Sequence, residues 1–190
     1  MKHLFFGLLA LLISGVLSPA SAQSKKGSGG GSGYTNGLGL RGGGFSSGAT
    51  FKHFMSGKNN VALEALLTTE YKARGARLTV LLEKHHQVSD IKGLQFYYGA
   101  GAHLGSYKGR YYYVERLYYH NKNKYKGYYN VYYNDDRNYV VFGADLILGL
   151  EYKMQDLPFV VGVDYKPYFE VFDGYTGFYN DAAVSLRFTF

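Results

Sequence analysis

The sequence predicts an all-β protein, an eight-stranded antiparallel up-and-down barrel. From about Asn36 onward, apolar and polar residues alternate in segments of about ten residues, which is the two-residue period of a β-strand. Clusters of Gly, Asn, Asp and Pro separate these segments, as expected of turns. No helix is expected to cover either face of the sheet, and closure into a barrel alone removes its exposed edges.

The alternation is clearest from Val140 to Lys153, where Phe142 and Leu146 belong to an apolar face and Asp145 and Glu151 to a polar one. In the next segment Pro167 weakens the strand locally, because proline cannot donate a ladder hydrogen bond. The same pattern gives eight strands at about 36–45, 49–56, 60–71, 76–87, 92–107, 139–153, 157–172 and 180–190.

The chain before the barrel divides into two parts. Residues 1–22 read as a secretory signal peptide: Lys2 gives the positive start, Leu4 to Leu17 the apolar stretch, and Ala20-Ser21-Ala22 the cleavage site. That stretch is shorter than the roughly 20 residues that span a bilayer. Residues 23–33 (QSKKGSGGGSG) read as a flexible Gly/Ser linker. The predicted barrel then occupies 34–190.

Composition excludes several classes of function. The chain has no Cys, which excludes disulfides, thiolate catalysis and Cys-based zinc sites. The net charge of +7 is confined to Lys2, Lys25, Lys26 and the segment 107–139, in which seven basic residues face three acidic ones. Because a nucleic-acid-binding fold needs basic residues along a folded face, no nucleic-acid partner is expected.

The polar face of the predicted strands distinguishes a membrane barrel from a soluble, lipocalin-like one. Periodicity alone cannot decide, because a soluble barrel turns its apolar face inward and a membrane barrel turns it toward lipid. Here the polar face combines glycines with bulky unlike charges, and glycines inside a narrow barrel make room for large charged neighbours. We therefore predict a transmembrane barrel with a lumenal ion network of Arg41, Lys52, Glu64, Arg77, Glu83, Asp145, Glu151, Asp164, Lys166 and Arg187.

Counting back from the strand ends predicts how these charges group. Glu151, Asp164 and Arg187 fall at similar depths on three successive strands, with Lys153 and Lys166 within reach. Unlike charges at that depth offset one another's desolvation. The lumen is thus expected to be plugged rather than open.

The connections predict an orientation in the outer membrane of a Gram-negative bacterium. With both barrel ends periplasmic, the turns near 57–59, 89–91 and 155–158 are periplasmic, and the longer stretches 107–139 and 173–179 are extracellular. The last strand alternates Leu186, Phe188 and a final Phe190, which resembles the signal that the barrel-assembly machinery recognises. Expected partners are therefore outer-membrane lipid and that machinery.

Several stretches stand out as a set: FYYGAGAHLG at 96–105, LGLEYK at 148–153, DYKP at 164–167 and LRFTF at 186–190, with TFKHF at 50–54. Together they resemble small outer-membrane β-barrel proteins of the Bacteroidetes type, which are porin-like or OmpA-like eight-stranded barrels. The resemblance covers nearly all of 37–190 and implies the fold and the location. It carries no general activity. The segment after Gly105 departs from the pattern.

Candidate catalytic and metal-binding residues are few. His103 and Ser106 near the outer end of the fifth strand could belong to a lipid hydrolase, but Glu83 lies at the wrong depth to complete a triad. His103 is better interpreted as a lumenal filler. His85 and His86 are adjacent in a strand and point to opposite faces, so they cannot share a metal. No catalytic residue, metal or cofactor is expected.

The segment 107–139 holds 12 of the 21 tyrosines, among Asn, Lys and Arg. It is predicted to be a hairpin that turns near 121–126, with an irregular loop as the alternative. Because Tyr combines a large apolar ring with a hydroxyl, the segment suits binding of an extracellular ligand that the sequence does not identify. The surface residues singled out are Arg110, Tyr111, Tyr112, Tyr113, Tyr118, Tyr119, Lys124, Lys126, Tyr128 and Tyr129.

These features predict a non-enzymatic outer-membrane protein with an envelope structural or adhesion role. The first alternative is a narrow pore or small-solute conduit, although an eight-stranded barrel is only wide enough for its own side chains. The second alternative is a membrane-embedded lipid-modifying enzyme built on His103 and Ser106.

Overall fold

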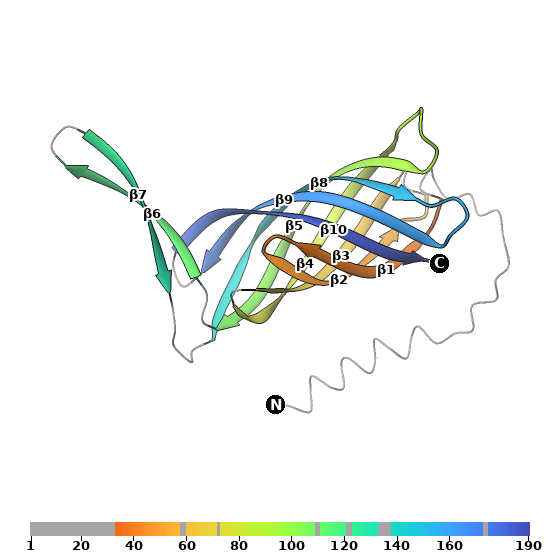
Figure 1. Ribbon diagram of the computed structural model, residues 1–190. Helices are drawn as coiled ribbons and strands as arrows, with labels where there is room; N and C mark the ends of the chain where they lie inside the picture. The colour runs from red at the N-terminus through yellow and green to blue at the C-terminus, as the bar shows by residue number, and fades with distance from the viewer. Residues whose placement is uncertain are drawn as a thin grey trace, which may run out of the picture.

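The computed structural model describes residues 33–57, 60–71, 73–108, 111–120, 123–132, 138–172 and 175–190, with side chains except in 111–132 and at 175. Eight antiparallel strands close into a barrel in the order β1-β10-β9-β8-β5-β4-β3-β2 (Figure 1). They are β1 (Asn36–Gly43), β2 (Ser46–Phe54), β3 (Val61–Glu70), β4 (Arg74–Gln87), β5 (Leu94–Lys108), β8 (Tyr139–Lys153), β9 (Phe159–Phe172) and β10 (Tyr175–Thr189). The all-β fold and the eight-stranded antiparallel barrel are therefore confirmed.

Two further strands, β6 (Tyr111–His120) and β7 (Asn123–Tyr132), pair with each other outside the barrel. Their register runs from Tyr111↔Tyr132 to His120↔Asn123. The hairpin lies beyond the end of the barrel at which β5 ends and β8 begins (Figure 1). We call that end the hairpin end, and the opposite end, where Asn36 and Phe190 bond through their backbones, the terminal end.

The signal peptide expected at 1–22 and nearly all of the linker expected at 23–33 lie outside the described residues. Within the ranges that the structure describes, no helix has the length and apolar character needed to cross a bilayer.

The largest difference from the sequence prediction is at the start of the last barrel strand. β10 begins at Tyr175 rather than at 180, so the longer loop expected at 173–179 is wrong. Aromatic cross-strand contacts extend the ladder: Phe178 lies opposite Phe169 with ring centroids 5.1 Å apart, and Tyr179 stacks on Tyr168 at 5.5 Å. Such pairs stabilise a sheet beyond backbone hydrogen bonding.

Pro167 lies inside β9 and opposite Asn180 of β10. On the other side of β9, the ladder with β8 runs as far as Asp145↔Tyr168 and resumes at Leu148↔Tyr165. Proline has no N–H to give to this ladder, so the sheet continues past it with a local interruption.

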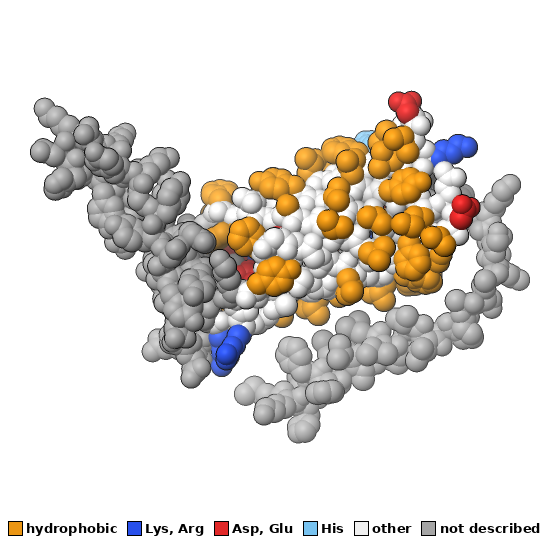
Figure 2. All heavy atoms as spheres, in the orientation of Figure 1, with side chains coloured by type: hydrophobic (Ala, Val, Ile, Leu, Met, Phe, Trp, Pro, Cys, Tyr) orange, Lys and Arg blue, Asp and Glu red, His pale blue; other side chains and the backbone are white. Residues whose placement is uncertain are grey.

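Ionisable side chains fill the inside of the barrel, and apolar side chains cover its outer surface. Among the side chains that the structure describes, fourteen ionisable ones other than tyrosine are buried: five Lys or Arg, seven Asp or Glu, and the two histidines His85 and His103. Large aliphatic and aromatic side chains instead line the outer surface, where Leu40 and Leu146 are among the most exposed (Figure 2). The alternation of each strand therefore points charge inward and hydrocarbon outward.

Glycines on the inner face accommodate large neighbours, as the sequence suggested. A Cβ at Gly149 would lie 2.4 Å from Cζ of Tyr97, and one at Gly143 would lie 2.6 Å from Cε1 of His103. Both distances are shorter than van der Waals contact. These positions therefore exclude larger residues, because the opposing ring and, at Gly143, the backbone oxygen of Phe169 at 2.0 Å occupy the space.

Three buried apolar clusters lie at different levels along the described barrel. Tyr34, Phe54, Ala62 and Val160 lie at the terminal end. Tyr107, Tyr139, Val141 and Phe172 lie at the hairpin end. Between the two ends lie Leu66, Leu81, Tyr97 and Ile147. Ile147 separates Asp145 from Glu151 along β8, so the charged residues fall into a terminal half and a hairpin half.

Candidate functional site

The ten charged residues that the sequence assigned to the lumen are all buried inside the barrel, and at most 7% of any of them is exposed. Every one of them has an oppositely charged partner. A lone buried charge would suffer a large desolvation cost, so the arrangement depends on mutual neutralisation.

In the terminal half, Lys52 lies among three carboxylates. Its Nζ is 2.7 Å from Glu83 Oε2, 3.2 Å from Glu151 Oε2 and 3.6 Å from Glu64 Oε2. The guanidinium of Arg187 joins the same group, with Nη2 2.6 Å from Glu64 Oε1 and Nη1 3.5 Å from Glu151 Oε2. Two cations thus contact three acidic side chains that come from β3, β4 and β8.

The position of Gly39 explains how Arg187 reaches this group from β10. Gly39 pairs with Arg187 on one side and with Thr50 on the other. With no side chain between them, Arg187 Nε donates to Thr50 Oγ1 at 3.1 Å, and Thr50 Oγ1 donates to Glu64 at 2.5 Å. The guanidinium therefore crosses β1 and binds a carboxylate three strands away.

The predicted grouping of Glu151, Asp164 and Arg187 is wrong for Asp164. It is also wrong for the two lysines that were expected nearby. Glu151 does meet Arg187, but Asp164 lies opposite Ala183 of β10 and Arg187 lies opposite Val160 of β9. The two are four positions apart along one ladder, or roughly 13 Å. Counting from strand ends missed this offset.

Asp164 instead belongs to a separate group with Arg41 and Asp181. Arg41 binds Asp164 with two nitrogens, at 2.6 and 3.3 Å, and Asp181 with a third at 2.9 Å. Ser46 Oγ also donates to Asp181 at 2.7 Å. Such fork-shaped contacts are the geometry in which arginine binds carboxylates most strongly.

Lys153 does not join the network, contrary to expectation. Its Nζ donates to the backbone carbonyls of Met154 and Leu157 at 2.9 and 2.8 Å in the β8–β9 turn. Lys166 binds Asp145, rather than the Glu151 group. The reason is again depth, because Lys166 faces the hairpin half of the lumen.

Several buried members of the site were not assigned from the sequence. Asp181 fell beside a predicted loop, although its spacing from Ser185 and Arg187 puts it on their inward face. Glu170 was placed on the polar face but not in the network, where it contacts Arg77 and His103. Tyr34 had no sequence signal, because it precedes the first strand.

Tyr34 lies at the terminal end of the lumen. Its hydroxyl donates to Glu151 Oε1 at 2.9 Å, and its ring packs edge-on against Phe54 at 5.0 Å. Burial raises the pKa of the Tyr34 phenol, and the Glu151 carboxylate raises it further. Tyr34 therefore remains a neutral donor at any physiological pH.

The two residues considered for hydrolysis do not meet. His103 is buried in the lumen, where its Nδ1 lies 2.6 Å from Asp145 Oδ2, whereas Ser106 has the opposite parity on β5 and is exposed on the outer surface. Alternate residues of a strand face opposite sides, so His103 cannot activate this serine. His85 and His86 likewise point apart, as predicted: His85 stacks on Tyr97 and His86 on Tyr98.

Of the remaining residues singled out from the sequence, three lie on the outer surface, and the structure does not describe the side chains of the others. Leu186, Phe188 and Phe190 face outward and are about half exposed. Arg110 is outside the described residues. The backbone of β6 and β7 carries the others, namely Tyr111, Tyr112, Tyr113, Tyr118, Tyr119, Lys124, Lys126, Tyr128 and Tyr129.

Comparisons with known proteins give no match to a family model, to a curated protein or to a solved structure. The function must therefore be argued from the residues and their geometry.

The contact between Arg187 and Glu64 can be tested by a double-mutant cycle. Arg187→Leu leaves buried carboxylates underpaired and should lower the free energy of unfolding by about 3 to 5 kcal/mol. Adding Glu64→Leu should cost less than the sum of the single changes, because each substitution removes the other's partner. Urea unfolding of the barrel in lipid vesicles measures the three variants.

Asp164→Leu provides the control for this cycle. Since Asp164 binds Arg41, its loss and the loss of Arg187 should add to within about 0.5 kcal/mol. Additivity for Glu64 and coupling for Asp164 would reverse the assignment of partners.

Proposed function

We propose that this chain is an integral barrel of a Gram-negative outer membrane, closed along its lumen, that holds the Tyr-rich hairpin at the cell surface. The observation that carries the proposal is the inverted distribution of side chains. Fourteen ionisable groups lie inside the barrel, while leucine, valine and phenylalanine side chains cover the outside. Lipid is the one solvent that such a surface suits.

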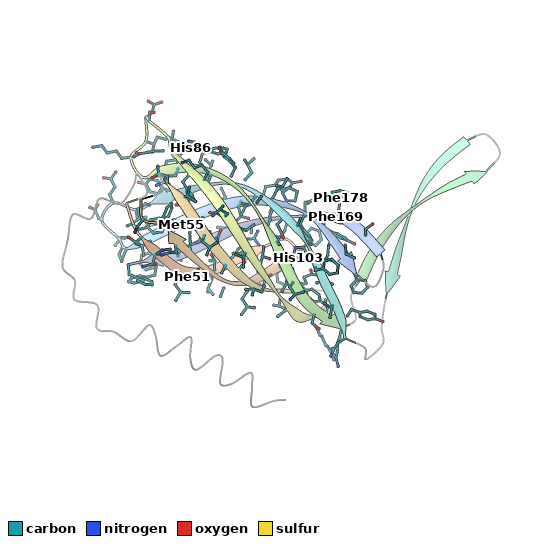
Figure 3. All side chains as sticks on the ribbon, turned by 180° about the vertical axis from the view of Figure 1, so that it is seen from behind. Phe51, Met55, His86, His103, Phe169 and Phe178 are labelled. Atoms are coloured by element: carbon teal, nitrogen blue, oxygen red, sulfur yellow. The ribbon has the colours of Figure 1, made fainter. Side chains whose placement is uncertain are left out.

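The outer surface has the pattern expected of a lipid-facing band. Leu146 and Leu148 of β8 lie between Phe142 toward the hairpin end and Tyr152 toward the terminal end, and all four are exposed. Aromatic contacts occur at both levels: Phe169 with Phe178 toward the hairpin end (Figure 3), and Phe159 with Phe188 toward the terminal end. Aromatic girdles at the two interfaces are typical of membrane barrels.

A soluble barrel is the structural alternative, and the lumen argues against it. A soluble barrel of this size would enclose its apolar residues and expose its charges. This lumen holds ion pairs, and the exposed apolar side chains form a band that surrounds the strands rather than one small patch. Large continuous apolar surfaces mark contact with another apolar phase.

A charge in the proposed lipid band gives a direct test. Leu148→Arg, near the middle of the band, should lower the free energy of unfolding by about 2 to 4 kcal/mol in lipid vesicles. The matched control is Leu157→Arg, because Leu157 is equally exposed but lies in the β8–β9 turn. We expect less than about 1 kcal/mol there. Equal losses at the two positions would exclude the membrane location.

The role proposed for the barrel is that of an anchor with an envelope structural or adhesion function. The hairpin is paired apart from the barrel, and its segment concentrates tyrosines with lysine and arginine. Tyrosine gives large contact areas at a low entropic cost, and the cations suit the phosphorylated outer leaflet. The stretches at 96–105 and 148–153 support a place among small Bacteroidetes-type outer-membrane barrels.

A pore is the second candidate, because membrane barrels commonly conduct. Its support is limited to the barrel itself, since buried apolar clusters occupy both ends of the lumen and ion pairs occupy the space between. An enzymatic role on lipids has less support, because His103 and Ser106 face opposite sides of β5.

Deleting the hairpin tests whether the hairpin, rather than the barrel, carries the adhesion function. Deletion of 110–137, with a short Gly/Ser connection, should leave a folded barrel with unchanged heat-modifiable migration on a gel. The same cells should lose adhesion to host or abiotic surfaces relative to cells with the full protein. Full adhesion without the hairpin would contradict the platform role, and failure to fold would assign the hairpin to assembly.

A further inference from the structure

Six side chains form a continuous chain of contacts in the hairpin half of the lumen. Lys166 binds Asp145, Asp145 binds His103, and His103 lies against Glu170. Glu170 is 3.5 Å from Arg77 Nη1, and the same nitrogen is 3.4 Å from Glu70. These residues come from β3, β4, β5, β8 and β9. His103 is the member whose charge the sequence does not fix.

Both ring nitrogens of His103 face carboxylates. Nδ1 is 2.6 Å from Asp145 Oδ2, and Nε2 is 3.3 Å from Glu170 Oε2. A neutral imidazole carries one N–H, so its other nitrogen would turn a lone pair toward a carboxylate oxygen. An imidazolium has a proton on each nitrogen and attracts both acids. The two contacts therefore favour the charged ring.

The charges of these six residues favour the same state. With His103 protonated, three cations alternate with three carboxylates and the six residues are neutral. With His103 neutral, the group carries one uncompensated negative charge, at a place where five of the six side chains are nearly inaccessible to solvent. Uncompensated charge in such surroundings is costly.

The other groups around the ring do not replace this proton. His103 pairs with Thr79 of β4 on one side and with Gly143 of β8 on the other, and neither ionises. The Tyr168 ring meets it edge-on at 5.5 Å, and that ring also packs against the cations of Arg77 and Lys166. Each of these cations binds one of the two acids: Arg77 binds Glu170, and Lys166 binds Asp145. His103 lies between Asp145 and Glu170, with one ring nitrogen toward each.

We propose that His103 is a buried proton-binding site, and that its proton fastens β5 to β8 and β9 and keeps the hairpin half of the lumen closed. The second clause rests on the closed lumen proposed above. Loss of the proton at alkaline pH turns a lone pair against an acid and leaves the two carboxylates without their shared cation. The stabilisation is thus present at acidic and neutral pH and is lost as the pH rises.

Direct observation of the ring tests the first clause. Ring-carbon NMR signals of His103, assigned by their absence in His103→Gln, are expected to be those of an imidazolium in the folded wild-type protein in detergent micelles at about pH 7, where an ordinary histidine is mostly neutral. A neutral His103 ring at that pH would overturn the proposal. The readout is taken on the wild-type protein, and the variant serves only to assign its signals.

The pH profile of stability tests the second clause. The urea midpoint of the wild-type protein should fall between about pH 6 and about pH 9, and His103→Gln should lose that fall. His86→Gln is the matched control, because His86 is on the neighbouring strand but exposed outside the barrel. It should retain the wild-type profile. Identical profiles for wild type and His103→Gln would contradict the proposal.

The two experiments are separate from the surface role. They use the folded barrel alone, so a protein that showed no adhesion could still contain the protonated His103. Conversely, a neutral His103 would leave the anchor function intact.

Discussion

The structure depends on the neutralisation of charge inside a narrow, closed lumen. An eight-stranded barrel leaves space for side chains and little else, so the inward residues must satisfy one another. Here five Lys or Arg side chains and seven carboxylates share that space. Burying any one of these charges alone would carry a large desolvation cost. Each therefore depends on an oppositely charged partner from another strand.

This constraint accounts for features that otherwise look unrelated. Glycine occurs where a ring or guanidinium must pass, as at Gly39 beneath Arg187 and at Gly149 beneath Tyr97. Tyr34 folds back from the chain before β1 to complete the hydrogen bonding of Glu151. Apolar clusters at both ends shield the ion pairs from water. Low dielectric in turn strengthens the pairs, so the plug and its shielding support each other.

The sequence predicted the strands and the inward face well because both follow from a period of two. Once Asp145 and Glu151 are assigned to one face of a strand, every second residue follows. The exceptions on that face are also explained: Ile147 belongs to a buried apolar cluster, and Tyr168 packs its ring against Arg77 and Lys166.

The partners inside the lumen could not be predicted in the same way. Arg187 reaches Glu64 across β1 and β2, which depends on the stagger of the strands and on the missing side chain of Gly39. Asp164 binds Arg41 across β10, the one strand that lies between β9 and β1. Alternation specifies the side of a sheet to which a residue points, but not the distance it extends or the strand it meets.

Electrical recording on the purified, folded protein tests the closed lumen most directly. In a planar bilayer at neutral pH, the protein should insert without adding steps of conductance, because the proposed closed lumen holds ion pairs and apolar clusters in place of a water-filled path. Insertion is verified independently by protease protection of the barrel. Regular, long-lived conductance steps from inserted wild-type protein would contradict the account, since they require a continuous aqueous path through the proposed plug.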